Sequence, residues 1–367
     1  MARGGSGRVA HALIPWLQKS LAASGIHATC GTLPSMDSEF DLIARIRARA
    51  GTRDDVLLGI GDDAAILRVP SGHDLAVSTD TLNIGVHFPA DTVPSDIGWK
   101  VLAVNLSDLA AMGAEPAWCT LNLALPDADG DWLDAFLDGF LELATRHDVA
   151  LVGGDTTRGP LSITVTVHGF IPHGMALRRS GAKVGDELWV SGALGDAAAG
   201  LALASPSPHV GEGLGRAGEH LRMRLDRPTP RVALGIALRG IANACVDVSD
   251  GLLADVSHVL AASSVGAVIE VAELPTSQAL RAAFDAKSRI AMQLGGGDDY
   301  ELCFTAPPAN AMDVIAVGAH ADIALARIGR IEAQTGLRLR DADGVVSDAP
   351  KIGYRHFDAS RKDGERT

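Results

Sequence analysis

Strand-like and helix-like segments follow one another in mixed order along this chain, and that order limits the folds it can adopt. Residues 39–48 have the apolar spacing of a short amphipathic helix, and residues 132–144 have that of a longer one. Apolar positions between Ile97 and Met112 predict a third helix, with Ser95 as its N-terminal cap and Gly113 just beyond its end. Three helices are therefore expected in the N-terminal half of the chain.

Strands are expected between and after these helices. Residues 75–81 (LAVSTDT) read as a buried strand with a polar end, and residues 162–171 (SITVTVHGFI) alternate as a half-buried strand. Gly, Pro and basic residues at 172–183 predict a hinge, and the composition of 205–220 predicts an exposed loop. Beyond the hinge we expect strands at 187–192, 265–271 and 301–306, and helices after Gly195, Pro230 and Gly251. This order favours two α/β or α+β domains without an internal repeat.

Length and charge narrow the classes of function. A chain of 367 residues is long enough for two domains, each with its own core. The net charge of −13 argues against nucleic acid as a partner. No apolar run approaches the ~18 residues of a membrane span. The four cysteines form no CxxC pair, which argues against a zinc site or a disulfide framework and fits the reducing cytosol. They are Cys30, Cys119, Cys245 and Cys303.

The first 35 residues differ from the rest of the chain. The run MARGGSGRVAHALIPWLQKS has an early Arg and a short apolar patch, but no long apolar region or small-residue cleavage site. Met36 opens a run, MDSEFDLIARI, that reads like a natural beginning. We therefore interpret residues 1–35 as a disordered extension or a mis-assigned start, and expect their removal to leave folding and activity nearly intact.

Six short turns place Asp beside Gly, Ser or Thr at the boundaries of the expected elements. They are GIGDDAA from Gly59, STDT from Ser78, NLSDLAAMGA from Asn105, GGDTTRG from Gly153, VDVSDGL from Val246 and GGGDDYEL from Gly295. A single such turn is most often structural, because Asp is common at caps and turns. Six in one chain indicate binding of hard cations and phosphate, since magnesium prefers carboxylate and hydroxyl oxygens and Gly permits close approach.

Other known solutions to phosphoryl transfer are absent from the sequence. There is no GxxxxGK[ST] loop, no HRD-type catalytic loop, no HExxH and no dinucleotide fingerprint after a first strand. The run GEGLGR at Gly211 lies in a polar segment and is a weak glycine match. The acidic turns therefore remain the main functional signal.

These turns, with the runs VLAVNLSDLAAMGAEPAW, LVGGDTTRGPLSITVTVHGF and RSGAKVGD, resemble the thiamine-monophosphate kinase family from about Glu39 to Phe357. The resemblance implies the mixed α/β fold of the aminoimidazole ribonucleotide synthetase superfamily. It also implies a dimerising N-terminal domain over 36–175 and a larger C-terminal α/β domain over 176–360, with the active site between them and a tail over 361–367. The implied activity is ATP-dependent phosphorylation of thiamine monophosphate, the last step of thiamine diphosphate synthesis, in a cytoplasmic homodimer with several magnesium ions.

The same resemblance implies roles for individual residues. Magnesium ligands are implied at Asp63, Ser78, Thr79, Asp80, Asp108, Asp155, Asp247 and Asp250. ATP contacts are implied at Gly154, Asp155, Arg179 and Ser249. Asp62 is expected to shape only the turn that carries Asp63.

Substrate contacts are implied at three further positions. His87 matches a position that meets thiamine monophosphate, with a solvated loop histidine as the alternative. Tyr354 resembles an aromatic residue that stacks on the thiamine, with tail packing as the alternative. Asp298 departs from the family, which usually has Glu there, so its carboxylate reaches about one methylene less far.

The implied acceptor is a phosphate oxygen and not an alcohol. The second pKa of a phosphomonoester is near ~6, so the acceptor is largely deprotonated at neutral pH and needs no general base. Magnesium ions would offset the repulsion between the acceptor and ATP, and direct in-line transfer follows. This agrees with a sequence that offers many carboxylates but no evident catalytic His or Cys.

Three alternatives differ in sequence features that can be checked. A selenophosphate synthetase would carry a reactive Cys or selenocysteine near its start, and a hydrogenase-maturation dehydratase would end in Cys, whereas this chain ends in HFDASRKDGERT. A non-catalytic nucleotide-sensing or metal-binding module would not need the full set of acidic turns together with Arg179.

Overall fold

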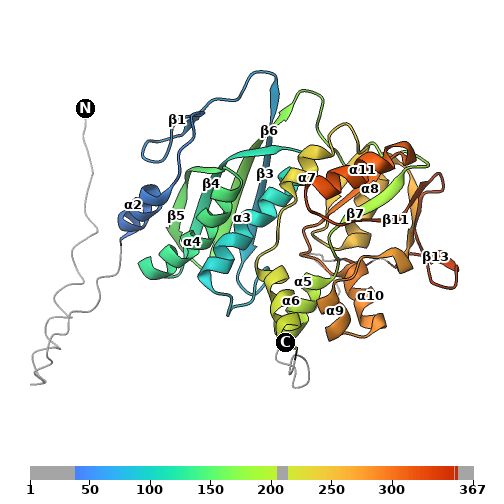
Figure 1. Cartoon of the computed structure of the whole chain (residues 1–367). Helices are drawn as coiled ribbons and strands as arrows, with labels where there is room; N and C mark the ends of the chain where they lie inside the picture. The colour runs from blue at the N-terminus through green and yellow to red at the C-terminus, as the bar shows by residue number, and fades with distance from the viewer. Residues whose placement is uncertain (1–37, 205–213, 351, 354–367) are drawn as a thin grey trace, which may run out of the picture. The chain divides into compact units, whose positions relative to one another are not determined.

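The computed structural model describes residues 38–204, 214–350 and 352–353. The N-terminal part consists of α2 (Glu39–Arg49), β1 (Val56–Leu58), β2 (Ile66–Leu67), β3 (His73–Asn83), α3 (Pro94–Ala111), β4 (Glu115–Leu125), α4 (Gly130–Arg146), β5 (Ala150–Arg158) and β6 (Ser162–Pro172). Its main sheet has the order β3-β6-β4-β5, in which only β4 and β5 are parallel. Helices α3 and α4 cover one face, because alternate apolar residues of β4 and β6 share their buried cluster (Figure 1).

Helix α3 begins two residues earlier than we predicted. Its cap residue is Val93, which makes no side-chain capping bond, and Pro94 occupies the first turn. The prediction of Ser95 as the cap was therefore wrong, because proline lacks an N–H that would need a cap. Gly113 ends the helix as predicted, since it adopts φ 64° and its N–H donates to Ala110 O at 2.9 Å.

Two glycines allow α3 and α4 to cross closely. A Cβ atom on Gly98 would lie 2.0 Å from Phe136 O, and one on Gly139 would lie 1.7 Å from Ser95 O. No larger residue fits these positions without separating the helices. The two glycines therefore set the close approach of α4 to the first turns of α3.

The C-terminal part is built on a seven-stranded sheet of order β13-β12-β9-β11-β7-β10-β8, in which only β12 and β9 pair in parallel. Its strands are β7 (Glu187–Ser191), β8 (Ala244–Asp247), β9 (Gly266–Glu270), β10 (Leu302–Ala306), β11 (Leu325–Glu332), β12 (Gly336–Arg340) and β13 (Val346–Asp348). Its helices are α5 (Asp196–Ala204), α6 (Arg216–Asp226), α7 (Val232–Ala237), α8 (Leu252–Ser263), α9 (Gln278–Ala283), α10 (Ala286–Gly295) and α11 (Ala311–His320), with short 3-10 turns at Val271–Glu273 and Pro308–Asn310.

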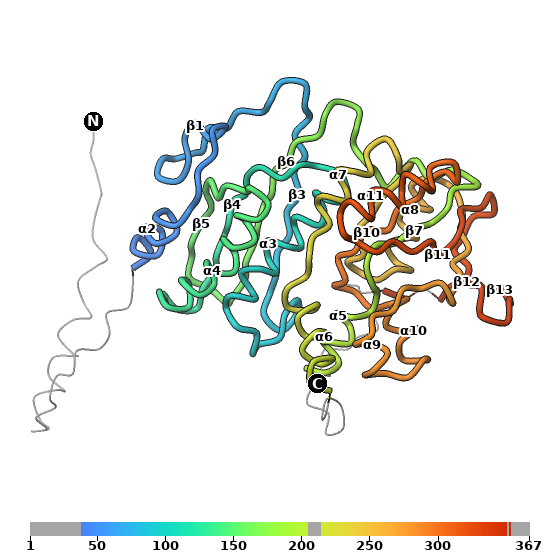
Figure 2. The backbone as a smooth tube through the Cα atoms, viewed as in Figure 1, coloured from blue at the N-terminus to red at the C-terminus, as the bar shows by residue number. Residues whose placement is uncertain are grey.

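Helix α3 packs against both parts. One buried cluster runs from Leu102 and Leu109 of α3 to Leu234 of α7 and Phe304 of β10. At the start of α3, Trp99 Nε1 donates a 2.8 Å hydrogen bond to Pro228 O in the segment between α6 and α7. Figure 2 shows α3 passing between the first sheet and α7. Residues from both parts can therefore meet along this helix.

Most predicted elements are confirmed, but two further interpretations were wrong. Strand β3 is not buried, since Leu75 is 43% and Val77 is 56% exposed. It is an edge strand, and these residues point to the sheet face opposite α3 and α4. The predicted loop over 205–220 is helical from Arg216, and its part at 205–213 lies outside the described residues.

Residues 1–35 and Cys30 also lie outside the described residues, whereas Cys119, Cys245 and Cys303 are buried free thiols. Within the described ranges, none of the helices combines the length and apolar character needed to cross a bilayer.

Candidate active site

Two of the acidic runs in the N-terminal part meet on α3. Neither is a turn as predicted, because Ser78 and Asp80 lie within β3 and Asp108 lies within α3. Ser78 Oγ of β3 donates a 2.6 Å hydrogen bond to Asp108 Oδ2. The Asp80 N–H donates to Asn105 Oδ1 at 3.0 Å. Ser78 and Asp80 are two positions apart in a strand and therefore face the same side. This side is the one that α3 covers, so the strand and the helix present their acids together.

The C-terminal part adds a third turn to the same helix. Ser107 Oγ of α3 donates a 2.7 Å hydrogen bond to Asp247 Oδ2 at the end of β8. The turn that follows is held by Asp255 Oδ2, which accepts from Ser249 N at 3.0 Å and from Asp250 N at 3.1 Å. Gly251, with φ 110°, lets the chain pass from this turn into α8.

The electrostatics show how closely these carboxylates are gathered. Desolvation raises the pKa of Asp80 to about 6, although the residue keeps exposed surface, and the charges of Asp108 and Asp250 add to the effect. Burial raises the pKa of Asp247 to about 7, with a further contribution from Asp108. Burial also raises the pKa of Asp255 to about 7, and Asp250 adds to it. Acids from both parts therefore repel one another when no cation is bound.

The charge of Arg179 acts on this group of acids. It is exposed, and its charge lowers the pKa values of Asp108 and Asp255 against the upward effect of burial. An exposed guanidinium beside desolvated carboxylates suits a ligand that carries phosphate groups and a cation. The acids alone would repel such a ligand.

The oxygen atoms of these acids suit a hard divalent cation, although the acids do not converge on a single point. Among the described residues, no three Asp, Glu, His or Cys side chains are grouped around one point as a metal site. The groups of Asp80, Asp108, Asp247 and Asp250 nevertheless influence one another's charge, and all their ligand atoms are oxygens. Oxygen ligands and clustered negative charge are what magnesium prefers.

Three of the expected metal ligands make their hydrogen bonds or strand pairings to residues outside this group. Asp63 is exposed in a turn, where its N–H donates to Asp62 Oδ1 at 2.9 Å. Asp155 is exposed in β5, beside Asn122 of β4 in the sheet register. The Thr79 hydroxyl donates to Val165 O at 3.1 Å, on the sheet face opposite Ser78 and Asp80.

Two of the remaining expected contacts, Gly154 and His87, belong to the N-terminal part. Gly154 has φ 149°, and a Cβ there would lie 1.8 Å from Leu121 O, so only glycine fits. His87 is half-buried, and its Nδ1 accepts from Asn83 N at 3.0 Å. Tyr354 lies outside the described residues.

Asp298 is held by two side chains that the sequence reasoning did not single out. Lys100 Nζ lies 2.9 Å from Asp298 Oδ2, and Tyr300 Oη donates to Oδ1 at 3.2 Å. Ser107 and Asp255 were also missed. Lys100 and Ser107 are seven positions apart on α3, which is two helical turns, so they share one face. This spacing, next to Asp108, could have indicated both residues.

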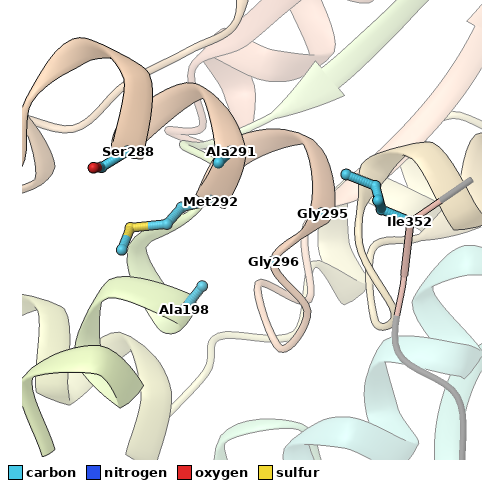
Figure 3. A pocket seen from close by; sticks show the side chains of 7 residues that line it. All are labelled: Ala198, Ser288, Ala291, Met292, Gly295, Gly296 and Ile352. Atoms are coloured by element: carbon cyan, nitrogen blue, oxygen red, sulfur yellow. The ribbon is translucent and has the colours of Figure 1, made fainter. Parts of the chain in front are cut away.

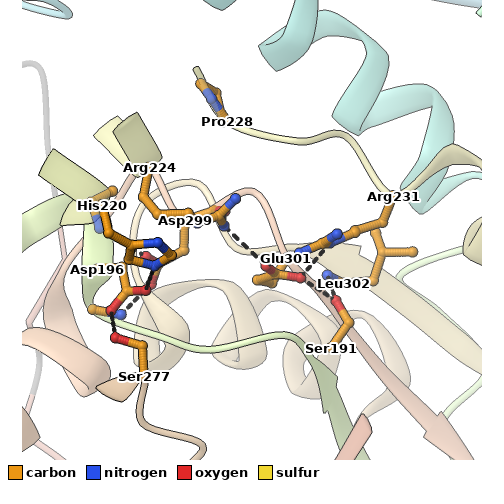
Figure 4. Close-up of polar contacts among 12 residues, drawn as sticks. Ser191, Asp196, His220, Arg224, Pro228, Arg231, Ser277, Asp299, Glu301 and Leu302 are labelled. Atoms are coloured by element: carbon orange, nitrogen blue, oxygen red, sulfur yellow. Dashed lines mark hydrogen bonds and ion pairs between the residues drawn. The ribbon is translucent and has the colours of Figure 1, made fainter. Parts of the chain in front are cut away.

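The strand that follows Asp298 is anchored by a buried ionic network. Glu301 is 1% exposed, and its carboxylate pairs with Arg224 at 2.9 Å and with Arg231 at 2.5 Å. Ser191 Oγ donates to the same carboxylate at 2.6 Å. Figure 4 shows the two arginines converging on Glu301. The network joins β10 to α6 and the start of α7, the segment that packs on α3.

Known families match both parts of this chain. The model for "AIR synthase related protein, N-terminal domain" matches residues 61–171, and the model for "AIR synthase related protein, C-terminal domain" matches residues 183–342. The chain is 49% identical over 324 residues to thiamine-monophosphate kinase of Escherichia coli K12, covering 87% of this chain and 98% of that protein. These matches agree with a two-domain mixed α/β fold.

Solved structures give the same result. A thiamine-monophosphate kinase from Stenotrophomonas maltophilia K279a is 53% identical, with a TM-score of 0.76 over 84% of this chain and 97% of the other. A structure described as AaThiL complexed with AMPPCP and TMP is 32% identical, with a TM-score of 0.70 over 87% of this chain and 97% of the other. Identity at this level over nearly the whole of each relative establishes common descent, and the chain belongs to the thiamine-monophosphate kinase family.

Proposed function

We propose that this protein transfers the γ-phosphoryl group of ATP to the phosphate of thiamine monophosphate, which forms thiamine diphosphate and ADP. The observation that carries the proposal is the meeting of Asp80, Asp108 and Asp247 along α3, beside Arg179. Family membership and a relative described with AMPPCP and TMP support the choice of donor and acceptor. The reaction completes the synthesis of thiamine diphosphate.

Magnesium is proposed as the cation of this site. The residues that would hold it are Asp63, Ser78, Thr79, Asp80, Asp108, Asp155, Asp247 and Asp250. Thr79 would contribute its carbonyl oxygen, because its hydroxyl is bonded to β6. When bound there, magnesium would supply positive charge against the phosphate groups. The mutual repulsion of Asp80, Asp108 and Asp250 supports this assignment.

The chain's own residues bind and orient the nucleotide in this proposal. Arg179 would pair with ATP phosphates, which its exposed position and planar donors suit. Gly154 and Ser249 would offer backbone and hydroxyl contacts, and Asp155 would bind both the nucleotide and the cation. As the acceptor oxygen bonds to the γ-phosphorus, the bond to the ADP oxygen breaks. No residue has to remove a proton, because the acceptor phosphate is already ionised.

A hollow beside the Asp298 turn is proposed to receive the thiamine rings. It has a volume of about 480 Å³ and is lined by Ala198, Met292, Gly295, Gly296 and Ile352, among others (Figure 3). The lining is mainly apolar, as aromatic rings require. Gly296 precedes Asp298 by two residues, and Ile352 precedes Tyr354 by two, so both expected substrate residues adjoin it in sequence. His87 is proposed as a further contact from the β3 side.

A homodimer formed by the N-terminal domain is proposed from the open face of β3. Leu75 and Val77 expose large apolar side chains there, and their neighbours on β6 are His168 and Phe170. An exposed apolar face on an edge strand is unfavourable in an isolated subunit. Replacing Val77 by Lys should convert a dimer to monomers in analytical ultracentrifugation, and an unchanged dimer would exclude this face.

Domain limits near 36–175 and 176–360 and a cytoplasmic location are part of the same proposal. They are supported by the two matched family regions and by the free buried thiols.

One experiment tests the proposed reaction directly. Purified protein is incubated with magnesium-ATP and thiamine monophosphate, and thiamine diphosphate is measured by chromatography. We expect stoichiometric ADP and thiamine diphosphate. ADP formation that does not depend on thiamine monophosphate, with no thiamine diphosphate, would reject the proposal.

A further inference from the structure

A buried lysine joins α3 to the Asp298 turn. Lys100 is 1% exposed, and its Nζ lies 2.9 Å from Asp298 Oδ2, whose side chain is 33% exposed. The pair links two residues 198 positions apart in the chain. A lysine with so little exposed surface is uncommon unless it has a charged partner. Here the partner reaches the surface of the candidate site, and the lysine lies beneath it.

Lys100 shares one face of α3 with Ser107, which follows it by seven positions, or two helical turns. Asp108 is the next residue along and projects about 100° further round the helix. Two turns correspond to roughly 11 Å along the helix axis. The Lys100–Asp298 pair therefore lies about two turns from the acids that are proposed to bind the cation.

The turn that carries Asp298 is held in an unusual backbone conformation. Asp298 and Tyr300 have φ values of 66° and 50°, a region that non-glycine residues rarely adopt. The turn is maintained by hydrogen bonds from Asp298 N to Ser249 O and from Gly195 N to Asp299 Oδ2, at 2.9 and 2.7 Å. Such conformations persist only where the surroundings enforce them, and they concentrate at functional sites.

The side chain of Asp298 is fixed as firmly as its backbone. Each carboxylate oxygen has one donor, Lys100 on Oδ2 and Tyr300 on Oδ1. A buried ion pair is seldom more stabilising than two apolar residues of the same size, because the desolvation of the charges offsets their attraction. The Lys100–Asp298 pair is therefore better explained by the orientation that it gives to the Asp298 carboxylate than by a contribution to stability.

We propose that Lys100 is a positioning residue of the acceptor site and acts through Asp298. The inference rests on the proposed function. Thiamine monophosphate carries a cationic ring as well as a phosphate. The Asp298 carboxylate accepts one hydrogen bond on each oxygen, so it keeps free lone pairs with which to contact this substrate. Lys100 restricts Asp298 to one orientation, so the acceptor does not have to order it on binding.

The test compares Lys100→Met, Asp298→Asn and the double variant with wild-type protein. KM for thiamine monophosphate, KM for ATP and kcat are measured for each. For Lys100→Met we expect KM for thiamine monophosphate to rise about tenfold, with KM for ATP within about twofold. The double variant should be no worse than Asp298→Asn alone, because Lys100 has no role once its partner is changed.

A matched control separates positioning from stability. Arg227→Met removes another ion pair between the two parts, in which Arg227 Nε lies 2.5 Å from Asp96. It should lower the melting temperature while KM for thiamine monophosphate stays unchanged. If the single variant Lys100→Met does not fold, the double variant is compared with Asp298→Asn instead. The double variant leaves no unpaired buried charge.

Two results would overturn the inference. One is an unchanged KM for thiamine monophosphate in folded Lys100→Met. The other is a double variant about tenfold worse than Asp298→Asn, which would show that Lys100 acts independently of Asp298. Wild-type protein that makes no thiamine diphosphate would instead reject the proposed function.

Discussion

Ser107 of α3 donates a 2.7 Å hydrogen bond to Asp247 of β8, so the residue beside Asp108 holds an acid of the other domain. Ser78 makes the corresponding contact to Asp108 from β3, at 2.6 Å. Hydroxyl donors thus orient two of the carboxylates before any cation is present. A hydrogen bond to an ionised carboxylate also lowers its pKa, which partly offsets the cost of gathering these acids.

Metal-free protein should lose stability as pH rises from about 4 to about 8. Burial raises the pKa values of Asp247 and Asp255 to about 7 in the folded state. In the unfolded chain both groups ionise near the ordinary Asp pKa of 3.8, so as pH rises the unfolded state loses these protons at a lower pH than the folded state. The contribution of the two groups to folding stability is therefore fully present below the unfolded pKa and is lost as pH rises through the folded pKa. We expect a decrease of at least about 2 kcal/mol between pH 5 and pH 8 in urea unfolding with EDTA.

Magnesium should reverse this dependence, because it stabilises the ionised carboxylates in the folded state only. The same unfolding series with saturating magnesium provides the comparison. Stability that rises from pH 5 to pH 8 without metal, or that does not respond to magnesium at pH 8, would contradict this account of the acidic group.

Thiamine should be a very poor acceptor compared with thiamine monophosphate. An alcohol has to lose a proton as it attacks, and the carboxylates of the acidic group that could accept it are proposed to hold the cation instead. The check is ADP formation with each acceptor at equal concentration, with thiamine monophosphate as the product standard for thiamine and thiamine diphosphate as that for thiamine monophosphate. Comparable turnover of thiamine would show that the acceptor has been assigned wrongly.

Glu301→Gln should destabilise the protein far more than a similar change at the surface. Glu301 is buried and pairs with Arg224 and Arg231, so removing its charge leaves two partly buried cations unpaired. The expected loss is about 3–5 kcal/mol. Glu270→Gln is the matched control, because the side chains of its pair with Arg340 are 34% and 41% exposed, against 1% for Glu301, and the pair should contribute less than about 1 kcal/mol. Equal losses in urea unfolding would show that the Glu301 network does not anchor β10.

Local patterns in the sequence predicted much of this fold. The spacing of apolar residues identified α3, and Gly113 marked its end because a left-handed residue is needed there. The start of α3 could not be placed, since proline and serine are both good first-turn residues. The exposure of β3 depends on which sheet face the helices cover, and alternation alone does not specify it.

The candidate site was predictable only in part, because local patterns do not show which distant residues will meet. Asp80, Asp108 and Asp247 stand out as acids in small-residue turns, whatever their partners. Lys100 reads as one polar residue in an apolar helix until the chain brings Asp298 to it from 198 residues away. Such long-range pairs follow from the packing of α3 between two sheets, which no local pattern encodes.

Asp80 and Asp108 are expected to bind metal and not to shuttle protons, and replacing either with Asn tests this. Asparagine keeps the size and most of the hydrogen-bonding geometry, including an acceptor for Ser78 at position 108, while removing one negative charge. Activity should collapse, and raising magnesium should recover part of it because mass action opposes weakened binding. Melting without metal should hold or rise, since fewer carboxylates then repel one another.

The control for both variants is Asp313→Asn, an exposed residue of the first turn of α11, which removes the same charge away from the site. It should leave both turnover and the magnesium titration unchanged. A purely structural role predicts the reverse pattern for Asp80 and Asp108, with stability lower by about 1 kcal/mol and activity per folded molecule retained. An Asp80 or Asp108 variant that melts early yet turns over normally at ordinary magnesium would therefore exclude that residue as a metal ligand.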